Sequence, residues 1–351
     1  MTKIVVAMSG GVDSSVTAAL LLKQGYEVMG LTMRLWQDER LKANHQAEID
    51  AAKVCSILGI EHKVMDYTKF FRETVVENFL TEYALGHTPN PCVYCNKKLK
   101  FGVLYEAAMK EGGDYLSTGH YVRLTQKDGF HYIQKAAYLA KDQSYVLYHL
   151  NQEILSHVVF PLGDYDKPQI RKLAEEMQLP VFAKKDSQEI CFIPDNDHHS
   201  FLATYGSKKE RSGNFVTTKG QILGVHKGLS HYTVGQRKGL GIASTEPFFV
   251  LALDSQTNTV VLGYSEEAAC QGLKAVDVVF ADGKKRCESF SCEVKIRYNA
   301  KPQSAKVLPG EDGEVAVLFT EPLRGIAPGQ AVVFYQGDIC IGGGTIMESI
   351  H

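Results

Sequence analysis

The chain has 351 residues, of which 44% are hydrophobic and 22% are charged. This is the composition of a folded globular protein, and at roughly 100–200 residues per domain the length predicts two or three domains. No apolar run approaches the roughly 18 residues of a membrane helix. The first residues are typical of a strand and not of a signal peptide. We therefore expect a cytoplasmic protein with no membrane partner. Eight cysteines in a chain of this length do not indicate a disulfide scaffold.

The net charge of −2 conceals an uneven distribution. Residues 203–265 carry seven Lys and Arg against three Asp and Glu, whereas residues 1–202 and 266–351 are each slightly acidic. Together with the changes in pattern described next, this predicts three domains with these boundaries. The central one is basic, which suits a polyanionic partner but is also typical of a solvated, loop-rich face.

Short apolar runs alternate with helical patterns along the first 200 residues. We expect strands at residues 4–8, 27–33, 62–65 and 115–118, and helices at 14–23, 49–58, 101–110 and 168–177. This rhythm predicts an α/β domain with a doubly wound parallel sheet and helices on both faces. From about residue 206 glycine becomes frequent. After about residue 247 alternating β segments follow, at residues 248–253, 259–262, 293–297, 314–319 and 331–335. They predict a small C-terminal β-barrel or sandwich.

A glycine-rich turn, SGGVDSS, stands at residues 9–15 between the first expected strand and helix. Gly10 and Gly11 permit a tight turn and a close approach of the backbone to a ligand. The helix that follows presents free N–H groups to an anion. Asp13 is unusual in an anion site and is expected to hold Mg²⁺ or to cap the helix. The turn lacks the Gly-Lys-Ser/Thr ending of a Walker A loop and is not the dinucleotide fingerprint. It resembles the signature of the PP-loop ATP pyrophosphatases. That resemblance implies an adenine nucleotide alpha hydrolase-like domain that cleaves ATP to AMP and pyrophosphate.

Two cysteine segments carry the second candidate site. Cys92 and Cys95 form a Cys-x-x-Cys pair that precedes an expected helix, and Cys191 lies 96 residues beyond Cys95. Lysines at 97, 98 and 100 predict a lowered pKa for a thiolate here. The cysteines could be unrelated, or could bind zinc, or could cooperate in nucleophilic sulfur chemistry. Zinc needs a second ligand pair, for which His198 and His199 are weak candidates.

Taken together, several motifs are similar to those of the bacterial and mitochondrial tRNA-specific 2-thiouridylases (tRNA-uridine 2-sulfurtransferases of the MnmA type). The matching segments are SGGVDS at 9–14, NPCVYCNK at 90–97, STGHY at 117–121, KDQSY at 141–145, DSQEICFI at 186–193, HYTVGQRKGLG at 231–241, RY at 297–298 and APGQ at 327–330. The likeness runs in order along essentially the whole chain.

The resemblance implies adenylation of the C2 oxygen of the wobble uridine, position 34, in the tRNAs for Lys, Glu and Gln, followed by replacement of that oxygen with sulfur. Cys191 would carry a persulfide delivered by a cysteine desulfurase or a sulfur-relay protein. Cys95 would be the partner nucleophile, and a Cys95–Cys191 disulfide would remain for a reductant to open. The ATP site, which would bind Mg²⁺ with ATP, would comprise Ala7, Met8, Ser9, Gly10, Gly11, Val12, Asp13, Ser14, Met33 and Gly119. The target base would meet Asn90, Pro91 and Cys92. Other tRNA contacts would come from His120, Lys141, Asp142, Gln143, Arg297, Tyr298 and Gln330.

Cys92 departs from part of the family, in which many members have Asp at this position. A thiol is a less effective general acid or base than a carboxylate. It also creates the possibility of a Cys92–Cys95 disulfide. As an alternative mechanism, Cys92, Cys95 and Cys191 could hold an Fe–S cluster with one open iron.

A tRNA substrate would have to flip its target base out of the anticodon stack. Its phosphates could follow the basic residues of the central segment, which are Lys208, Lys209, Arg211, Lys219, Lys227, Arg237 and Lys238. His226, His231 and Tyr232 could stack on RNA or simply pack. Two other classes of function remain open at this stage: a PP-loop ligase or amidotransferase acting on a small molecule, and a non-enzymatic RNA-binding module.

Overall fold

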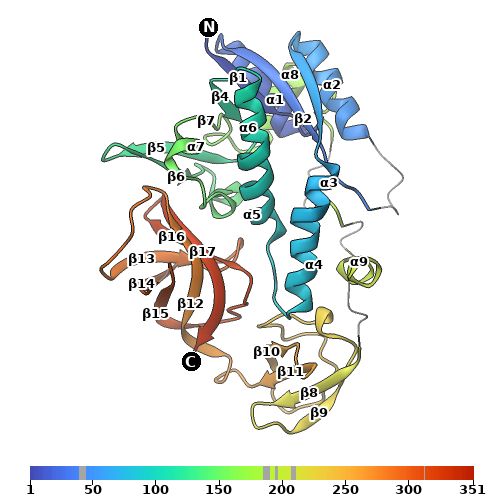
Figure 1. Cartoon of the computed structure of the whole chain (residues 1–351), viewed down its shortest axis with the longest axis vertical. Coiled ribbons are helices and arrows are strands. Elements are labelled where there is room, and N and C mark those ends of the chain that lie inside the picture. The colour runs from blue at the N-terminus through green and yellow to red at the C-terminus, as the bar shows by residue number, and fades with distance from the viewer. Residues whose placement is uncertain (39–44, 185–189, 194–196, 207–210, 312) are drawn as a thin grey trace.

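A five-stranded parallel sheet forms the centre of the N-terminal domain in the computed structural model (Figure 1). The structure describes residues 1–38, 45–184, 190–193, 197–206, 211–311 and 313–351. The strand order is β3-β2-β1-β4-β7, and every neighbouring pair is parallel. This confirms the predicted parallel sheet. The strands are β1 (Lys3–Ala7), β2 (Glu27–Arg34), β3 (Glu61–Asp66), β4 (Tyr115–Ser117) and β7 (Val158–Val159).

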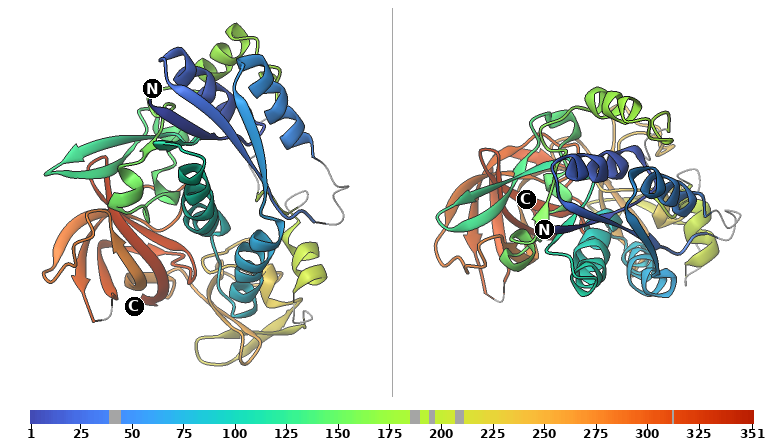
Figure 2. Two further views of the ribbon diagram at one scale, coloured as in Figure 1. Left: turned by 45° about the horizontal axis from the view of Figure 1, so that its top comes forward. Right: turned by 90° about the horizontal axis from the view of Figure 1, so that it is seen from above.

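Helices cover both faces of this sheet, as predicted for a doubly wound domain (Figure 2). Successive side chains of a strand point to opposite faces. In β1, Ile4 and Val6 therefore enter one hydrophobic core, whereas Val5 enters the other. The first core is closed by α1 (Val12–Lys23), α2 (Gln46–Leu58) and α8 (Lys167–Glu176), and the second includes α6 (Leu104–Lys110).

The helix predicted at residues 101–110 is correct only from Leu104 onward. It is preceded by α5 (Pro91–Cys95) and by a π-helical segment, Asn96–Val103. Within that segment, Phe101 (φ −104°, ψ 15°) and Gly102 (φ −110°, ψ −108°) leave the helical region. The conformation of Gly102 is one that a residue without a Cβ adopts readily, so the glycine breaks the continuous helix that the apolar pattern suggests.

Several other elements of the N-terminal part carry no strong sequence signal. Thr68–Phe71 (α3) continues through a π-helical segment, Arg72–Val76, into α4 (Glu77–Ala84). The remainder are the hairpin β5 (Val122–Lys127) and β6 (Phe130–Lys135), the 3₁₀ turns Leu139–Lys141 and Ser144–Val146, α7 (Gln152–Leu155) and α9 (His198–Tyr205).

The central segment folds around a four-stranded sheet in the order β10-β11-β8-β9. Its strands are β8 (Gly213–Thr217), β9 (Ile222–His226), β10 (Phe249–Asp254) and β11 (Thr259–Gly263), and a 3₁₀ turn spans Leu229–His231. The last two strands match the predicted segments at 248–253 and 259–262, but they belong to this central sheet and not to the C-terminal barrel or sandwich to which those segments were assigned. The first two strands were not predicted. Phe215, Tyr232 and Val250 belong to its small core.

The C-terminal segment is a closed barrel, which resolves the choice between barrel and sandwich. Its strands follow the order β12-β15-β14-β13-β16-β17, and β17 pairs again with β12. They are β12 (Ala269–Phe280), β13 (Phe290–Lys295), β14 (Gln303–Pro309), β15 (Val315–Arg324), β16 (Ala331–Gln336) and β17 (Ile339–Ile350). The predicted segments at 293–297, 314–319 and 331–335 fall on β13, β15 and β16.

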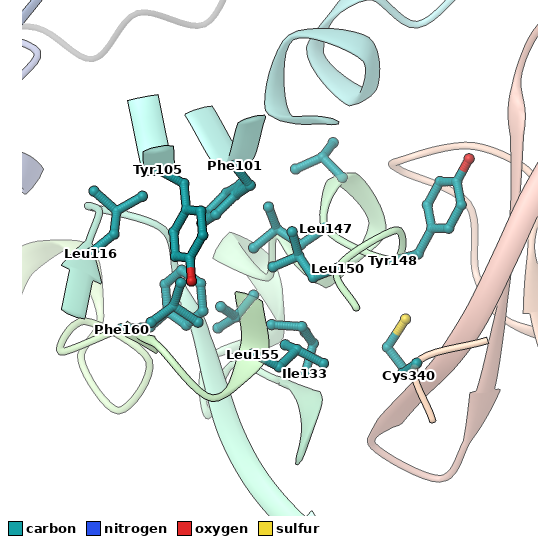
Figure 3. Packing of buried hydrophobic residues seen from close by; sticks show 14 of the residues in the cluster. Phe101, Tyr105, Leu116, Ile133, Leu147, Tyr148, Leu150, Leu155, Phe160 and Cys340 are labelled. Atoms are coloured by element: carbon teal, nitrogen blue, oxygen red, sulfur yellow. The ribbon is translucent and has the colours of Figure 1, made fainter. Parts of the chain in front are cut away.

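The hairpin β5–β6 joins the N-terminal domain to the barrel. β6 pairs with β17 through Gln134 and Ile133, opposite Ile339 and Cys340. Cys340 packs into the same hydrophobic cluster as residues of the N-terminal domain, among them Ile133 and Tyr148 (Figure 3). A shared apolar core of this kind fixes the two domains against each other. None of the described helices has both the length and the apolar character needed to cross a membrane.

Candidate active site

The glycine-rich turn leads from β1 directly into α1 and is built to leave the helix N-terminus open. Gly10 has φ +68°, and a Cβ at this position would lie 2.2 Å from the carbonyl oxygen of Ala47. Gly11 is the N-cap residue in an extended conformation and provides no side-chain cap. The hydroxyl of Ser14 accepts from the backbone N–H of Ser9 at 3.1 Å and so closes the turn. The first N–H groups of α1 can therefore serve an anion, as predicted.

Asp13 does not cap α1, because it lies in the first turn and Gly11 occupies the N-cap position. Its Oδ1 accepts from the Nζ of Lys167 at 2.7 Å and from the hydroxyl of Tyr121 at 2.6 Å. A carboxylate already neutralised by an ammonium group is a poor ligand for Mg²⁺ on its own. The donor set of the turn therefore does not fit a magnesium ion held by protein alone, and Mg²⁺ that arrives with ATP would rely on phosphate oxygens.

Two lysines that the sequence analysis did not select contact the glycine-rich turn. Besides Lys167 at the start of α8, Lys184 donates to the carbonyl oxygen of Gly10 and to Asp50, each at 2.9 Å. Neither lysine lies in the glycine-rich motif, and both reach it only through the fold. The helix predicted at 168–177 and the capping box that begins α8 at Asp166 place Lys167 near a helix start, but neither signal shows that its side chain reaches Asp13.

The remaining predicted ATP-site residues gather at the same edge of the sheet. Ala7 ends β1, Met8 follows it, and Met33 lies near the end of the adjacent β2. Gly119 follows β4, and a Cβ there would lie 3.0 Å from backbone atoms of Asp13 and Ser14. The carboxyl ends of parallel strands form the ligand crevice of such sheets. The structure thus brings these residues together, while their contact with ATP stays a prediction.

The thiol pair lies on α5, whose start is strongly specified. The side chain of Asn90 caps it by accepting from the N–H of Val93 at 3.2 Å, and Pro91 occupies the first turn. Cys92 and Cys95 follow one turn apart, the first exposed and the second half-buried. Asn90 and Pro91, predicted to meet the target base, thus also set the geometry of the thiols.

The barrel holds the loop that leads into α5. The backbone N–H of Thr88 donates to the carbonyl of Pro328 at 2.8 Å, and the side-chain amide of Gln330 donates to the carbonyl of Thr88, also at 2.8 Å. Gln330, predicted to contact tRNA, therefore holds the loop before the cysteines in place. The APGQ motif acquires this role only because β16 follows it in the barrel.

Cys191 lies beside the pair on α5, although it is distant in sequence. Its neighbour Phe192 is buried and packs at 5.5 Å from the rings of both Phe71 and Phe79. Cys95 packs against this same hydrophobic cluster. The nearby charges of Cys95 and Cys92 contribute to raising the pKa of Cys191. The predicted convergence of the two cysteine segments is therefore present in the fold. The motif residues 186–189 that lead into Cys191 lie outside the described residues.

The expectation of a lowered thiol pKa is wrong for this structure. Desolvation by the surrounding protein raises the pKa of Cys95 to about 11 and that of Cys191 to about 12. It also raises the pKa of Cys92. Lys100 opposes these rises, but its charge is the smaller effect. Lys97 and Lys98 are exposed and act on none of the three thiols.

His120 lies between the glycine-rich turn and the thiols. Burial lowers its pKa well below the usual value, with smaller effects from Lys100 and His149, so the ring is neutral. Its Nε2 lies 3.4 Å from the Nζ of Lys100 and accepts from it, which leaves Nδ1 to donate to the Thr118 hydroxyl at 2.7 Å. His120 thus positions Lys100 beside the cysteines. Sequence reasoning considered Lys100 only as one of three lysines, and it missed His149.

The other predicted tRNA contacts lie around this centre. Asp142 is buried and accepts from the hydroxyl of Ser144 at 2.7 Å, and Gln143 accepts from the N–H of Tyr121 at 2.8 Å. Both residues therefore shape the loop that also carries Lys141. Arg297 donates to the carbonyl of Gly325. Burial raises the pKa of Tyr298 to about 12, with further contributions from Asp142 and Cys92, so this barrel residue is near the thiols. Direct tRNA contact stays a prediction for all of these residues.

The described residues contain no three His, Cys, Asp or Glu side chains arranged to hold a metal ion. In this arrangement the three thiols do not form a ready cluster site. The ring of His199 stacks on that of His231 with centroids 4.0 Å apart, so it serves as a contact between α9 and the central domain. His226 and Tyr232 are buried and pack in the central domain. The described basic residues of that domain are all exposed, namely Arg211, Lys219, Lys227, Arg237 and Lys238. Lys208 and Lys209 lie outside the described residues.

A glycine-rich turn at the carboxyl edge of a parallel sheet, with cysteines beside it, is typical of the PP-loop class of ATP-using enzymes. Three family models match the chain: the "tRNA methyl transferase HUP domain" at residues 2–195, the "tRNA methyl transferase PRC-barrel domain" at 199–264 and the "Aminomethyltransferase beta-barrel domain" at 270–346. Curated relatives match over nearly their whole length. A "tRNA-specific 2-thiouridylase MnmA 1" of Thermoanaerobacter pseudethanolicus is 45% identical over 99% of both chains. The "tRNA-specific 2-thiouridylase MnmA" of Clostridium acetobutylicum is 46% identical over 98% of this chain and 99% of its own.

The chain belongs to the MnmA family of tRNA-specific 2-thiouridylases, which are sulfurtransferase enzymes. Among solved structures, a 4-thiouridine synthetase in complex with RNA and ATP matches 56% of this chain and 46% of its own, with 18% identity and a TM-score of 0.36. A likeness at that level carries no argument about this protein.

Proposed function

We propose that the enzyme uses ATP to adenylate the C2 oxygen of the wobble uridine, position 34, in the tRNAs for Lys, Glu and Gln, and then replaces this oxygen with sulfur. The observation that carries the proposal is the short link between two sites. Gly119 packs against the glycine-rich turn, and the next residue, His120, contacts Lys100 beside the thiols. A base held between them would be within reach of both a nucleotide and a sulfur nucleophile.

ATP would place its phosphates over the N-terminus of α1. The open N–H groups there provide donors, and Lys167 and Lys184 add positive charge at the same turn. The adenylate turns the C2 oxygen, otherwise a poor leaving group, into part of AMP. Mg²⁺ bound to ATP supplies charge neutralisation when present. Because tRNA and ATP are the substrates, we place the reaction in the cytoplasm.

Sulfur would come from a persulfide on Cys191, delivered by a cysteine desulfurase or a sulfur-relay protein. Attack of the Cys95 thiolate on the Cys191 sulfur forms the Cys95–Cys191 disulfide and releases the terminal sulfur as hydrosulfide. Hydrosulfide displaces AMP from C2 and gives 2-thiouridine. The raised pKa of both thiols keeps them protonated at rest, so each requires a local positive charge to react. Lys100 is the described cation that acts on both.

The tRNA would bind across all three domains. The exposed Lys219, Lys227 and Arg237 of the central domain are suited to phosphate contacts, which make binding dependent on salt. Tyr298, from the barrel, lies near Cys92 and is suited to contact a flipped base there. Reversing the charge of the three central residues should weaken tRNA binding at low salt. Unchanged affinity would remove this part of the proposal.

The test is an anaerobic reaction of the full chain with unmodified tRNA for Glu, Mg-ATP and a persulfide donor, followed by mass spectrometry of the digested nucleosides. We expect 2-thiouridine at position 34, and its loss in Cys95→Ser and Cys191→Ser. Cys287→Ser, which removes an exposed thiol of the barrel, serves as the matched control and should retain activity. ATP cleavage that ignores tRNA, with no thiolated uridine, would contradict the proposal and favour a small-molecule ligase.

A further inference from the structure

Cys92 is a third thiol at the site, and beyond its predicted contact with the target base it has no chemical step in the reaction proposed above. It stands three residues before Cys95 within α5, so the two Cα atoms of this helical turn are about 5 Å apart. That separation lies within the roughly 4.4–6.8 Å range that a disulfide requires. All three cysteines of the site are free thiols. The chain can therefore form a Cys92–Cys95 disulfide without moving between elements.

Cys95 neighbours both of the other cysteines of the site. Phe192 fixes the segment of Cys191 by packing against Phe79 at 5.5 Å and Phe201 at 5.4 Å, and Cys95 borders the same hydrophobic cluster. On its other side, Cys95 is joined to Cys92 by one helical turn. A thiol on α5 thus stands next to any disulfide that Cys95 makes with Cys191.

Cys92 and Cys191 are both exposed, whereas Cys95 is half-buried. A disulfide between the two residues of α5 would place the sulfur of Cys92 at the surface, where a dithiol reductant could attack it. Each disulfide of Cys95 includes one exposed residue, so what the exchange changes is the state of Cys191 and not the access of a reductant.

We propose that Cys92 is a resolving thiol. This inference rests on the proposed function, which leaves a Cys95–Cys191 disulfide after sulfur transfer. The Cys92 thiolate attacks the sulfur of Cys95, a Cys92–Cys95 bond forms, and the Cys95–Cys191 bond breaks. The electron pair of the broken bond remains on Cys191, which takes up the proton that Cys92 lost. The exchange is internal and needs no oxidant or reductant. A dithiol reductant then opens the Cys92–Cys95 disulfide in a separate step.

The exchange separates the acceptance of a new persulfide by Cys191 from the reduction of the disulfide, which would otherwise both involve Cys191. Cys191 becomes a free thiol again and can accept the next persulfide while the oxidised pair waits on α5 for its reductant. An Asp at position 92 could not perform this step, because a carboxylate cannot form the new sulfur–sulfur bond.

The test follows the thiols during one turnover of the full-length enzyme. Persulfide-loaded protein is mixed with Mg-ATP and tRNA under anaerobic conditions without reductant. Samples are quenched in acid, alkylated and digested, and both 2-thiouridine and disulfide-linked peptides are measured by mass spectrometry. In the wild type we expect Cys95–Cys191 to appear with 2-thiouridine and then to be lost as Cys92–Cys95 accumulates and Cys191 regains alkylation.

Two variants remove the resolving thiol in different ways. In Cys92→Ser and Cys92→Asp we expect Cys95–Cys191 to persist in proportion to whatever 2-thiouridine forms, so the readout does not depend on the overall activity. Cys287→Ser controls for the loss of an exposed cysteine and should behave as the wild type.

Three results would overturn the inference. The wild type could keep Cys95–Cys191 for as long as the Cys92 variants do. Cys191 could return to the free thiol equally fast in Cys92→Ser. Protein purified anaerobically could hold iron with all three thiols protected from alkylation, which would make them cluster ligands. Failure of the proposed function is distinguishable, because 2-thiouridine itself would then be absent from the same samples.

Discussion

The open N-terminus of α1 leads to a sharp prediction at Gly11. Its backbone, at φ −102° and ψ 170°, is one that alanine adopts freely. Among the described residues, a Cβ there would meet only the Ser9 hydroxyl, at an ordinary contact distance of 3.4 Å. Losing the glycine N-cap costs up to about 1 kcal/mol, and the stiffer unfolded chain offsets roughly 0.4–1 kcal/mol of that. We therefore expect the free energy of unfolding of Gly11→Ala to lie within about 1 kcal/mol of the wild-type value.

The same methyl group would stand where a phosphate must approach the helix. A hydrogen bond to a charged group contributes about 1.5–3 kcal/mol, so the loss of one N–H contact should weaken ATP binding roughly 10- to 150-fold. The assay is ATP titration calorimetry on the full chain, paired with equilibrium unfolding. ATP affinity equal to that of the wild type would refute the placement of phosphates over α1.

The neighbouring glycine should respond in the opposite way. Gly10→Ala combines a positive φ, which costs about 1–2 kcal/mol for a residue with a Cβ, with a clash 2.2 Å from the Ala47 carbonyl oxygen. Gly25→Ala is the matched control, because Gly25 has φ +86° but no atom of the described residues within 4 Å of the added Cβ. We expect Gly10→Ala to lose clearly more stability than Gly25→Ala. Equal losses would mean that the turn can move away from α2.

Further predictions concern the charges and contacts around the two sites. Lys100→Met removes the positive charge that favours the thiolate, so the pKa of Cys95 should rise above about 11 and its alkylation at about pH 8 should slow. Lys100→Arg should retain most of the wild-type alkylation rate. An unchanged pH profile of alkylation in the Met variant would contradict the role of Lys100 in favouring the thiolate. Lys167→Met removes the ammonium group 2.7 Å from the carboxylate of Asp13. The negative charge of Asp13 is then left uncompensated beside the expected phosphates, so ATP affinity should fall about tenfold or more, a result that calorimetry can check. Gln330→Ala loses a hydrogen bond of 2.8 Å to the loop before α5 and should lower the free energy of unfolding by about 1 kcal/mol in denaturant titrations.

Local sequence patterns predicted a feature correctly where it lies within one secondary-structure element or between two adjacent ones. The alternation of β1 with the glycine-rich turn predicted a strand, a turn and a helix in the correct places, because backbone freedom at Gly10 and the apolar period of the helix are properties of adjacent residues. The barrel strands β13, β15 and β16 were predicted for the same reason, whereas β12, β14 and β17 were not predicted. The hairpin β5–β6 was missed because its partner strand is distant in sequence. Val122 and Ile133 are buried in the core that includes Cys340 of the barrel, and β6 pairs with β17, in a domain that begins more than a hundred residues later.

The thiol site shows where local reasoning fails. Lysines next to Cys95 in sequence predicted a lowered pKa, but a pKa depends on everything that surrounds the sulfur. Packing of the Phe192 cluster against α5 removes water, and the resulting desolvation exceeds the effect of Lys100.

The sequence by itself determined the chemical parts of this protein: a glycine-rich turn before a helix, three cysteines in two segments, a basic central domain and a C-terminal β domain. Only the tertiary structure decided how these parts meet. It closed the barrel, clamped the loop before α5 with Gln330, brought Cys191 to Cys95, and placed Lys167 on Asp13 across 154 residues of chain. The physical reason is that residue type and local period act over a few positions, whereas charge, burial and clamping act through space.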